Sequence, residues 1–273
     1  MLKYAFVLLL ILPTIVIGVS LLEPIEKEVG DESVLLGAVA PGQTLELKFS
    51  RDTGVLAAIN PATKKNALWD QASVVKLTLP EGWTSKDSLK YENPLTVYVT
   101  VSPTAEKRQY TFSVVFLDEY EGTPTAVTRF KVDVDPDVVE LSLDKPTVTA
   151  GVGQPALFLL RAKSRSIASD TFVIKATGLP YDWQFKKTFF LPHEGEQEVF
   201  FEVVGNIQKE VSFSINVTSL SSPAVVKKLD AKVVTTSDLL QDAKSASLGL
   251  PLFPSVEQHV YSLFGLVSNL LFK

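Results

Sequence analysis

Hydrophobic and polar residues alternate along most of this chain. Between residues 34 and 235 the period is two rather than 3.6, as where Leu45, Leu47 and Phe49 alternate with polar neighbours. Similar runs lie at 97–101, 112–114 and 211–217. Strict alternation indicates strands with one buried and one solvated face, which is typical of antiparallel sheets. With turn signals between the runs, the pattern predicts an all-β fold class and antiparallel β-sandwiches of about seven short strands each.

The pattern occurs twice. Leu79–Trp83 returns as Leu179–Trp183 one hundred residues later, and the strands that follow return in the same order. A constant offset predicts two tandem copies of one domain, which we place at residues 21–135 and 136–236. Pro136 lies at the boundary, where it cannot join a sheet ladder and stiffens the linker. Because Trp83 and Trp183 occupy the same place in both copies, we interpret them as core residues rather than a binding platform.

The first copy carries an insertion. Gly42 to Trp83 takes 41 steps, whereas Gly153 to Trp183 takes 30. The difference of 11 residues falls between residues 52 and 70, a stretch that ends with Trp69 and Asp70. If the chain binds carbohydrate, the unique aromatics Trp69 and Tyr91 are the predicted contact residues, because sugar binding needs exposed, coplanar rings.

The two ends depart from the strand pattern. Lys3, the apolar run 4–18 and the small residues ending at Ser20 predict a signal peptide or N-terminal anchor over residues 1–20. Residues 237–273 are predicted to be helical, with a capping box at 255–258 before an amphipathic stretch. Its apolar stripe comprises Val256, Val260, Leu263, Phe264, Val267, Leu270 and Leu271. We expect this stripe to bind a protein partner or a second copy, to dock on its own sandwich, or to contact a membrane peripherally.

Composition removes several classes of function. The chain has no cysteine and only two histidines, so thiolate chemistry, disulfides and histidine-rich metal sites are excluded. The net charge of −5 and the absence of a basic stripe with interleaved aromatics give no reason to expect nucleic acid. We therefore predict no cofactor and no enzymatic activity.

A strand followed by Leu-Pro-x-x-Trp and then by strands ending in an aromatic-x-Phe-x-aliphatic run resembles immunoglobulin-like domains of the NEW3 type. The second copy fits better, through Gly153-Gln154, Leu179–Trp183 and residues 196–204. The first departs through its insertion and its short loop at 87–89. This resemblance covers about 200 of the 273 residues. It implies tandem domains of archaeal or bacterial exported surface proteins, and no catalytic residues.

Three further groups are candidate sites. Tyr98 and Phe200 point outward from equivalent strands, which predicts a partner-binding surface. Asp133, Asp135 and Asp137 alternate through the linker, where they either hold calcium or form a solvated turn. Asn216 begins the only N-glycosylation sequon, in an outward position.

These observations predict a non-catalytic exported module of the cell envelope, secreted or anchored at the outer face of the cytoplasmic membrane. It scaffolds or binds partners through its sandwich surfaces and its C-terminal helix. A carbohydrate-binding module of the cell surface is the alternative, and an enzyme would need a pair of acids in a cleft that no motif supplies.

Overall fold

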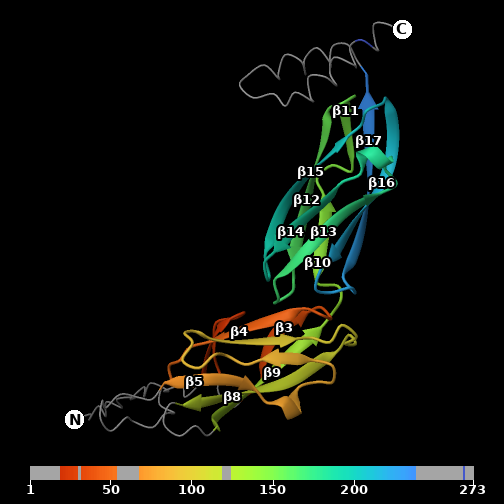
Figure 1. Ribbon diagram of the computed structural model, residues 1–273. Helices are drawn as coiled ribbons and strands as arrows, with labels where there is room; N and C mark the ends of the chain where they lie inside the picture. Colours follow the sequence, from red (N-terminus) through yellow and green to blue (C-terminus); the bar gives the residue numbers. More distant parts are fainter. Residues whose placement is uncertain (1–18, 30–31, 54–67, 119–123, 238–266, 268–273) are drawn as a thin grey trace, which may run out of the picture.

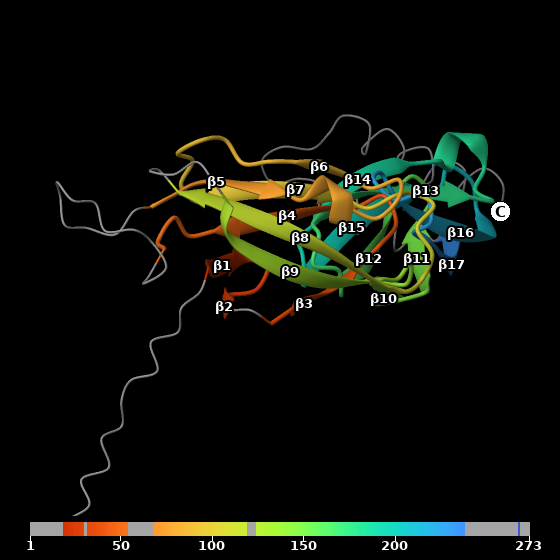
Figure 2. The ribbon, with the colours of Figure 1, turned by 90° about the horizontal axis from the view of Figure 1, so that it is seen from below.

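The computed structural model describes residues 19–29, 32–53, 68–118, 124–237 and 267. In these residues it is all-β, as predicted, and forms two sandwiches joined end to end at an angle (Figure 1). Seen from below, the first sandwich lies in front of the second (Figure 2). Of the predicted C-terminal helix only Val267 is described, and it is helical and 41% exposed. No helix within the described residues has the length and apolarity to cross a bilayer.

The first sandwich consists of a five-stranded and a four-stranded sheet. The five-stranded sheet has the order β2-β1-β4-β7-β6, with strands Lys27–Val29, Val19–Glu23, Thr44–Phe49, Leu95–Thr100 and Thr84–Lys86. The four-stranded sheet has the order β3-β9-β8-β5, with strands Val34–Val39, Pro124–Val134, Gln109–Asp118 and Trp69–Val74. A short 3-10 helix, η1 (Lys76–Thr78), follows β5.

The second sandwich consists of a three-stranded and a five-stranded sheet. The three-stranded sheet has the order β10-β12-β15, with strands Val139–Leu143, Pro155–Ser164 and Glu196–Val204. The other has the order β11-β17-β16-β13-β14, with strands Thr147–Gly151, Val226–Thr236, Lys209–Ser219, Asp170–Thr177 and Lys186–Leu191. The 3-10 helix η2 (Tyr181–Trp183) precedes β14.

The strand order of both sandwiches is immunoglobulin-like. In each sandwich the last two strands form a hairpin that lies between two earlier strands of the same sheet, β5 and β3 in the first and β13 and β11 in the second. The opening strands of each copy are divided between both sheets. The early strands β3 and β11 run parallel to the final strands β9 and β17. Apart from an isolated parallel bridge between Ala38 and Ser166, all other pairings among the described residues are antiparallel, which matches the alternating burial from which the fold was predicted.

The two copies differ in the strand that follows the repeated tryptophan. In the first, β6 pairs with β7 and belongs to the five-stranded sheet that contains β1. In the second, β14 pairs with β13 and so belongs to the opposite sheet. In the first sandwich no strand pairs with β5 in the place that β14 takes beside β13, and residues 87–91 cover that edge of β5. Ser88 Oγ accepts a hydrogen bond from Ala72 N at 2.9 Å, and Asp87 Oδ1 accepts one from Val74 N at 3.0 Å. These side chains thus occupy backbone N–H groups of β5 that could otherwise pair with a strand of another chain.

Both repeated tryptophans lie in the cores, as predicted. Trp83 is 6% exposed and packs against Tyr110, with ring centroids 5.2 Å apart. Trp183 is 3% exposed, and its Nε1 donates to Asn206 Oδ1 at 2.9 Å. Each ring fills one end of its sandwich, which explains why the motif recurs.

Strand β1 begins before the predicted signal boundary. Val19 is 1% exposed and pairs with Val29, and Leu21 is fully buried in the same core. A cut after Ser20 would therefore fall inside β1 and remove one of its core side chains.

Candidate functional site: the joint between the sandwiches

The two sandwiches exchange core residues at their joint. Strand β9 ends at Val134 and β10 begins at Val139, and the loop between β12 and β13 returns to meet the first sandwich. Ile167 N in this loop donates to Ala38 O at 2.9 Å. Ile167 and Ala168 are buried in the first core, whereas Ala40 is buried in the second. Because each core is completed by the other domain, the joint is a packed interface rather than a free linker.

Gln43 lies at the centre of a buried polar network across this interface. It is 1% exposed, and its Oε1 accepts from Ala40 N at 2.9 Å and from Ser166 Oγ at 2.7 Å. Its Nε2 donates to Asp170 Oδ2 at 2.9 Å. One amide side chain thus satisfies groups in both sandwiches, and it fixes their mutual position because a buried amide is costly to leave unpaired.

Asp170 is the anchor of this network in the second sandwich. It is 7% exposed, and its Oδ2 also accepts from Ser219 Oγ at 2.6 Å. Its Oδ1 accepts from Thr171 N at 2.7 Å. Ser219 Oγ in turn accepts from Ser222 N at 2.7 Å, which holds the turn after β16. A carboxylate with three hydrogen-bond donors is a stable arrangement at a buried site.

The linker acids form the rim of the joint. Asp137 pairs with Lys227 and lies 3.8 Å from Arg165, which also bonds the Asp137 carbonyl at 2.7 Å. Asp135 lies 2.9 Å from Lys107. The bond from Lys227 is the main cause of a lowered pKa at Asp137. At Asp135 burial raises the pKa, but the bonds from Asp137 N and Lys107 outweigh it, so the pKa is lowered.

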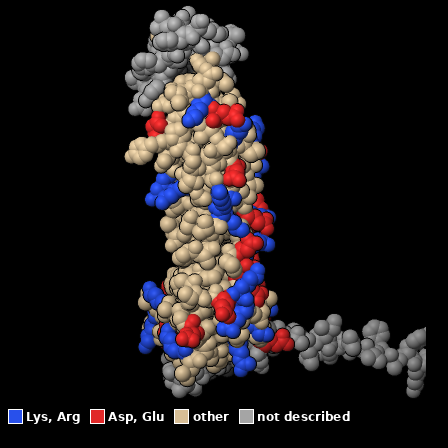
Figure 3. Space-filling model, turned by 90° about the vertical axis from the view of Figure 1, so that its right-hand side faces the viewer, with Lys and Arg blue, Asp and Glu red and all other residues tan. Residues whose placement is uncertain are grey.

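The three linker acids do not converge on one point. Asp133 accepts from Gln109 Nε2 at 3.0 Å, whereas Asp135 and Asp137 face different cations. No group of three metal-ligating side chains occurs in the part of the chain that the structure describes. Acidic and basic side chains are intermixed along the face seen in Figure 3. Asp135 and Asp137 are therefore ion-pair partners at the joint, whereas Asp133 accepts a hydrogen bond from a neutral side chain.

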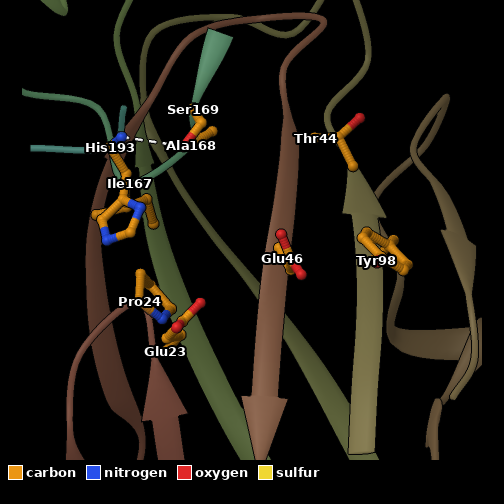
Figure 4. A pocket seen from close by; sticks show the side chains of 9 residues that line it. All are labelled: Glu23, Pro24, Thr44, Glu46, Tyr98, Ile167, Ala168, Ser169 and His193. Atoms are coloured by element: carbon orange, nitrogen blue, oxygen red, sulfur yellow. Dashed lines mark hydrogen bonds between the residues drawn. The ribbon is translucent and has the colours of Figure 1, made fainter. Parts of the chain in front are cut away.

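A pocket of about 230 Å³ opens beside the joint (Figure 4). Both sandwiches line it, through Glu23, Pro24, Thr44, Glu46 and Tyr98 of the first and Ile167, Ala168, Ser169 and His193 of the second. The two carboxylates share Lys48, at 2.7 Å from Glu23 and 3.5 Å from Glu46, and the bond from Glu23 is the main reason that the pKa of Lys48 is raised. His193 N donates to Ser169 Oγ at 3.0 Å. One ammonium group pairs with both carboxylates, so one negative charge is left between them.

The two predicted carbohydrate residues lie on neighbouring segments, since Tyr91 N donates to Asp70 O at 2.9 Å, but only one of the two rings is exposed. Trp69 is fully buried at the start of β5, 5.7 Å from the ring of Phe116, so the prediction that it forms an exposed platform is wrong. Tyr91 is 62% exposed, with the Arg51 guanidinium 5.7 Å from its ring centroid. The insertion itself, residues 54–67, lies outside the described residues. An isolated bridge between Asp52 and Leu68 closes its base.

The remaining candidates lie on sheet faces. Tyr98 is half-buried under Lys86, whose Nζ is 5.8 Å from the ring centroid, and Phe200 is 48% exposed. Both point outward as expected, from the equivalent strands β7 and β15. Asn216 is half-buried on β16, and its Nδ2 donates to Thr177 Oγ1 at 3.0 Å. Of the residues in the C-terminal stripe, Val256, Val260, Leu263, Phe264, Leu270 and Leu271 lie outside the described residues.

The joint residues Gln43 and Asp170 were not predicted. They are 127 positions apart, and each stands in an ordinary strand or turn context. The one signal in the sequence is that Asp170 begins a strand at a position where its carboxylate would be buried. A buried carboxylate requires hydrogen-bond or ion-pair partners.

Comparisons with known proteins found similarity to this chain among solved structures only. No family model and no curated protein matches it. Among solved structures, the chimeric titin Z1Z2 with a decorin KLER peptide is 11% identical, with 76% of this chain and 95% of that chain covered and a TM-score of 0.37. PapD-like domain 7 of human CEP192 is 10% identical, covering 37% and 87%, with a TM-score of 0.25. The C. elegans MSP family member WR4 is 12% identical, covering 35% and 97%, with a TM-score of 0.26.

Proposed function

We propose that this chain is a non-catalytic module of the cell envelope that acts as a bent, two-domain spacer and presents its sandwich surfaces to partners. The joint carries the proposal. A linker of independent domains would need no buried amide, whereas here Gln43 bonds both sandwiches and Ile167 fills the core of the other domain. Such a joint sets a fixed distance and angle between whatever binds at the two ends.

The exported setting is part of the proposal. It is supported by the apolar run 4–18 with Lys3 before it, and by the resemblance of the repeats to NEW3-type surface domains. The apolar stripe at 256–271 would recruit a partner or a second copy at the other end. A chain without cysteine keeps its fold in an oxidising compartment without disulfides, because the sandwich cores and the joint stabilise it.

Two measurements test the proposal. Small-angle scattering of the full chain should fit the bent arrangement of Figure 1, whereas a chain with Gln43→Ala and Ile167→Ser should sample a broader range of shapes. In a prokaryotic host, a C-terminally tagged full chain should fractionate with the envelope and be cut when protease is added to intact cells. A cytosolic, protease-protected chain would refute the exported role, and a flexible wild-type joint would refute the spacer role.

A further inference from the structure

The outer face of the five-stranded sheet in the second sandwich carries a row of lysines. The registers place Lys186 of β14 opposite Lys175 of β13, Lys175 opposite Asn216 of β16, and Asn216 opposite Lys228 of β17. All three lysines are exposed. Since neighbouring strands lie about 4.8 Å apart, the row extends over roughly 15 Å. We call these three residues the lysine row.

The lysine row is not neutralised by the chain itself. Other exposed lysines have partners, such as Lys163 with Glu196 at 2.7 Å. Within the described part of the chain, no carboxylate lies at ion-pair distance from the lysine row. The nearest acid by register, Asp230, is one row away and accepts from Ser214 Oγ at 2.8 Å. Like charges placed opposite each other destabilise a sheet, so the row has a cost that an external anion would remove.

Apolar side chains border the lysine row on the side of the joint. The next row consists of Thr188, Val173, Thr218 and Val226. In this row Val173 is buried and Val226 is 55% exposed. Beyond it, Phe190 of β14 and Leu220, on either side of Thr171, are 57% and 64% exposed. The face therefore combines a line of cations with a flat apolar border.

We propose that this face docks on an anionic lipid bilayer. Lysine is depleted from the cores of protein interfaces, which disfavours a protein partner for a surface centred on lysines. A soluble polyanion would pair with the lysines but gain nothing from Phe190, Leu220 and Val226. A membrane surface uses both, because its headgroups attract the ammonium groups and its interface accepts exposed apolar side chains. This function goes beyond the spacer role and does not depend on it.

The test measures binding of the full chain to vesicles by flotation. One set is phosphatidylcholine alone, and the other is equal parts phosphatidylcholine and phosphatidylglycerol. The variant combines Lys175→Gln, Lys186→Gln and Lys228→Gln. Its matched control combines Lys90→Gln, Lys145→Gln and Lys209→Gln, three exposed lysines on other surfaces. The control variant has the same change in net charge as the lysine-row variant. Any vesicle binding through the apolar segments 4–18 and 256–271 is common to all three chains, so it does not contribute to the difference between them.

A lysine near an anionic surface strengthens binding about fivefold, so the lysine-row variant should bind anionic vesicles about 100-fold more weakly than wild type. The control should bind as wild type does, and Phe190→Ser with Leu220→Ser should weaken binding further. Removing opposed charges leaves thermal stability equal or raised, which shows that the variant folds. Equal binding by variant and wild type, or wild-type binding indifferent to phosphatidylglycerol, would overturn the proposal. Lysine-dependent binding to heparin without lysine-dependent binding to vesicles would instead assign the face to a soluble polyanion.

Discussion

The side-chain amide of Gln43 donates to the Asp170 carboxylate at 2.9 Å, between residues 127 positions apart that belong to different sandwiches. The same amide accepts from Ala40 N and Ser166 Oγ, so one buried side chain has hydrogen bonds to both domains. This contact makes the two repeats one mechanical unit.

Gln43→Ala should lower the free energy of unfolding by about 2–4 kcal/mol, because it leaves buried donors and a carboxylate without their partner. Urea titration measures the change. The neighbouring Thr44→Ala, which removes only an exposed bond to Thr100, is the control and should cost under about 0.5 kcal/mol. Equal effects of the two substitutions would show that the amide has no special role in the joint.

Gly42→Ala should also open the joint. Gly42 has φ of +85°, and a Cβ there would lie 2.4 Å from Ser221 O of the other sandwich. The backbone conformation alone costs about 1 kcal/mol for alanine, and the clash adds to it. Gly82→Ala, at φ of +75° inside the first sandwich, shares the backbone strain without touching the second. Scattering should report a changed interdomain arrangement for Gly42→Ala only; a change in both, or in neither, would contradict this.

Acid should weaken the rim of the joint. The pKa of Asp137 is lowered from 3.8, first through its bond with Lys227, so folding favours the ionised form. The stabilisation by the ionised carboxylate is therefore complete above the pKa that Asp137 has in the unfolded chain. It is lost as the pH falls through the lower pKa that Asp137 has in the folded protein. Urea midpoints should therefore be flat above about pH 5 and fall below about pH 4. Asp137→Asn and Lys227→Met should each flatten that fall, and an unchanged pH dependence in both would contradict the assignment.

Much of the fold follows from the sequence, because strand alternation reports burial directly. The period-two runs became strands, and the repeated Trp83 and Trp183 became core residues. The switch of β6 and β14 between sheets does not follow, since the same tryptophan motif precedes both. Which sheet they join depends on edge contacts such as those of Ser88 with β5, which no local pattern encodes.

The candidate sites were harder to predict, because they depend on residues brought together from distant strands. Counting residues places Trp69 within the insertion, although it starts β5 opposite Asp118. The lysine row comes from three strands separated by 11 and 42 positions in the sequence, so no motif marks it. Only the registers place Lys186, Lys175 and Lys228 in one line.

Alanine substitution should destabilise the fold at Trp69 and leave it nearly unchanged at Tyr91. Trp69→Ala removes a fully buried ring and should cost about 3–5 kcal/mol of unfolding free energy. Tyr91→Ala, at a site 62% exposed, should change it by less than about 0.5 kcal/mol. Thermal or urea unfolding gives both values. A stable Trp69→Ala chain that had lost binding to a surface polysaccharide would restore the carbohydrate reading of that residue.

A glycan on Asn216 should abolish lipid binding by the sheet face. Asn216 stands in register between Lys175 and Lys228, so a sugar attached to its Nδ2 would project from the middle of the lysine row. Attachment replaces one of the two Nδ2 hydrogens, so the amide retains one N–H for the bond to Thr177 Oγ1. Chain produced in a glycosylating host should bind anionic vesicles as weakly as the lysine-row variant, whereas Asn216→Gln from the same host should bind as the unmodified chain does. Mass spectrometry of Asn216 identifies the modified fraction. Strong vesicle binding by fully glycosylated chain would mean that the membrane contacts another surface.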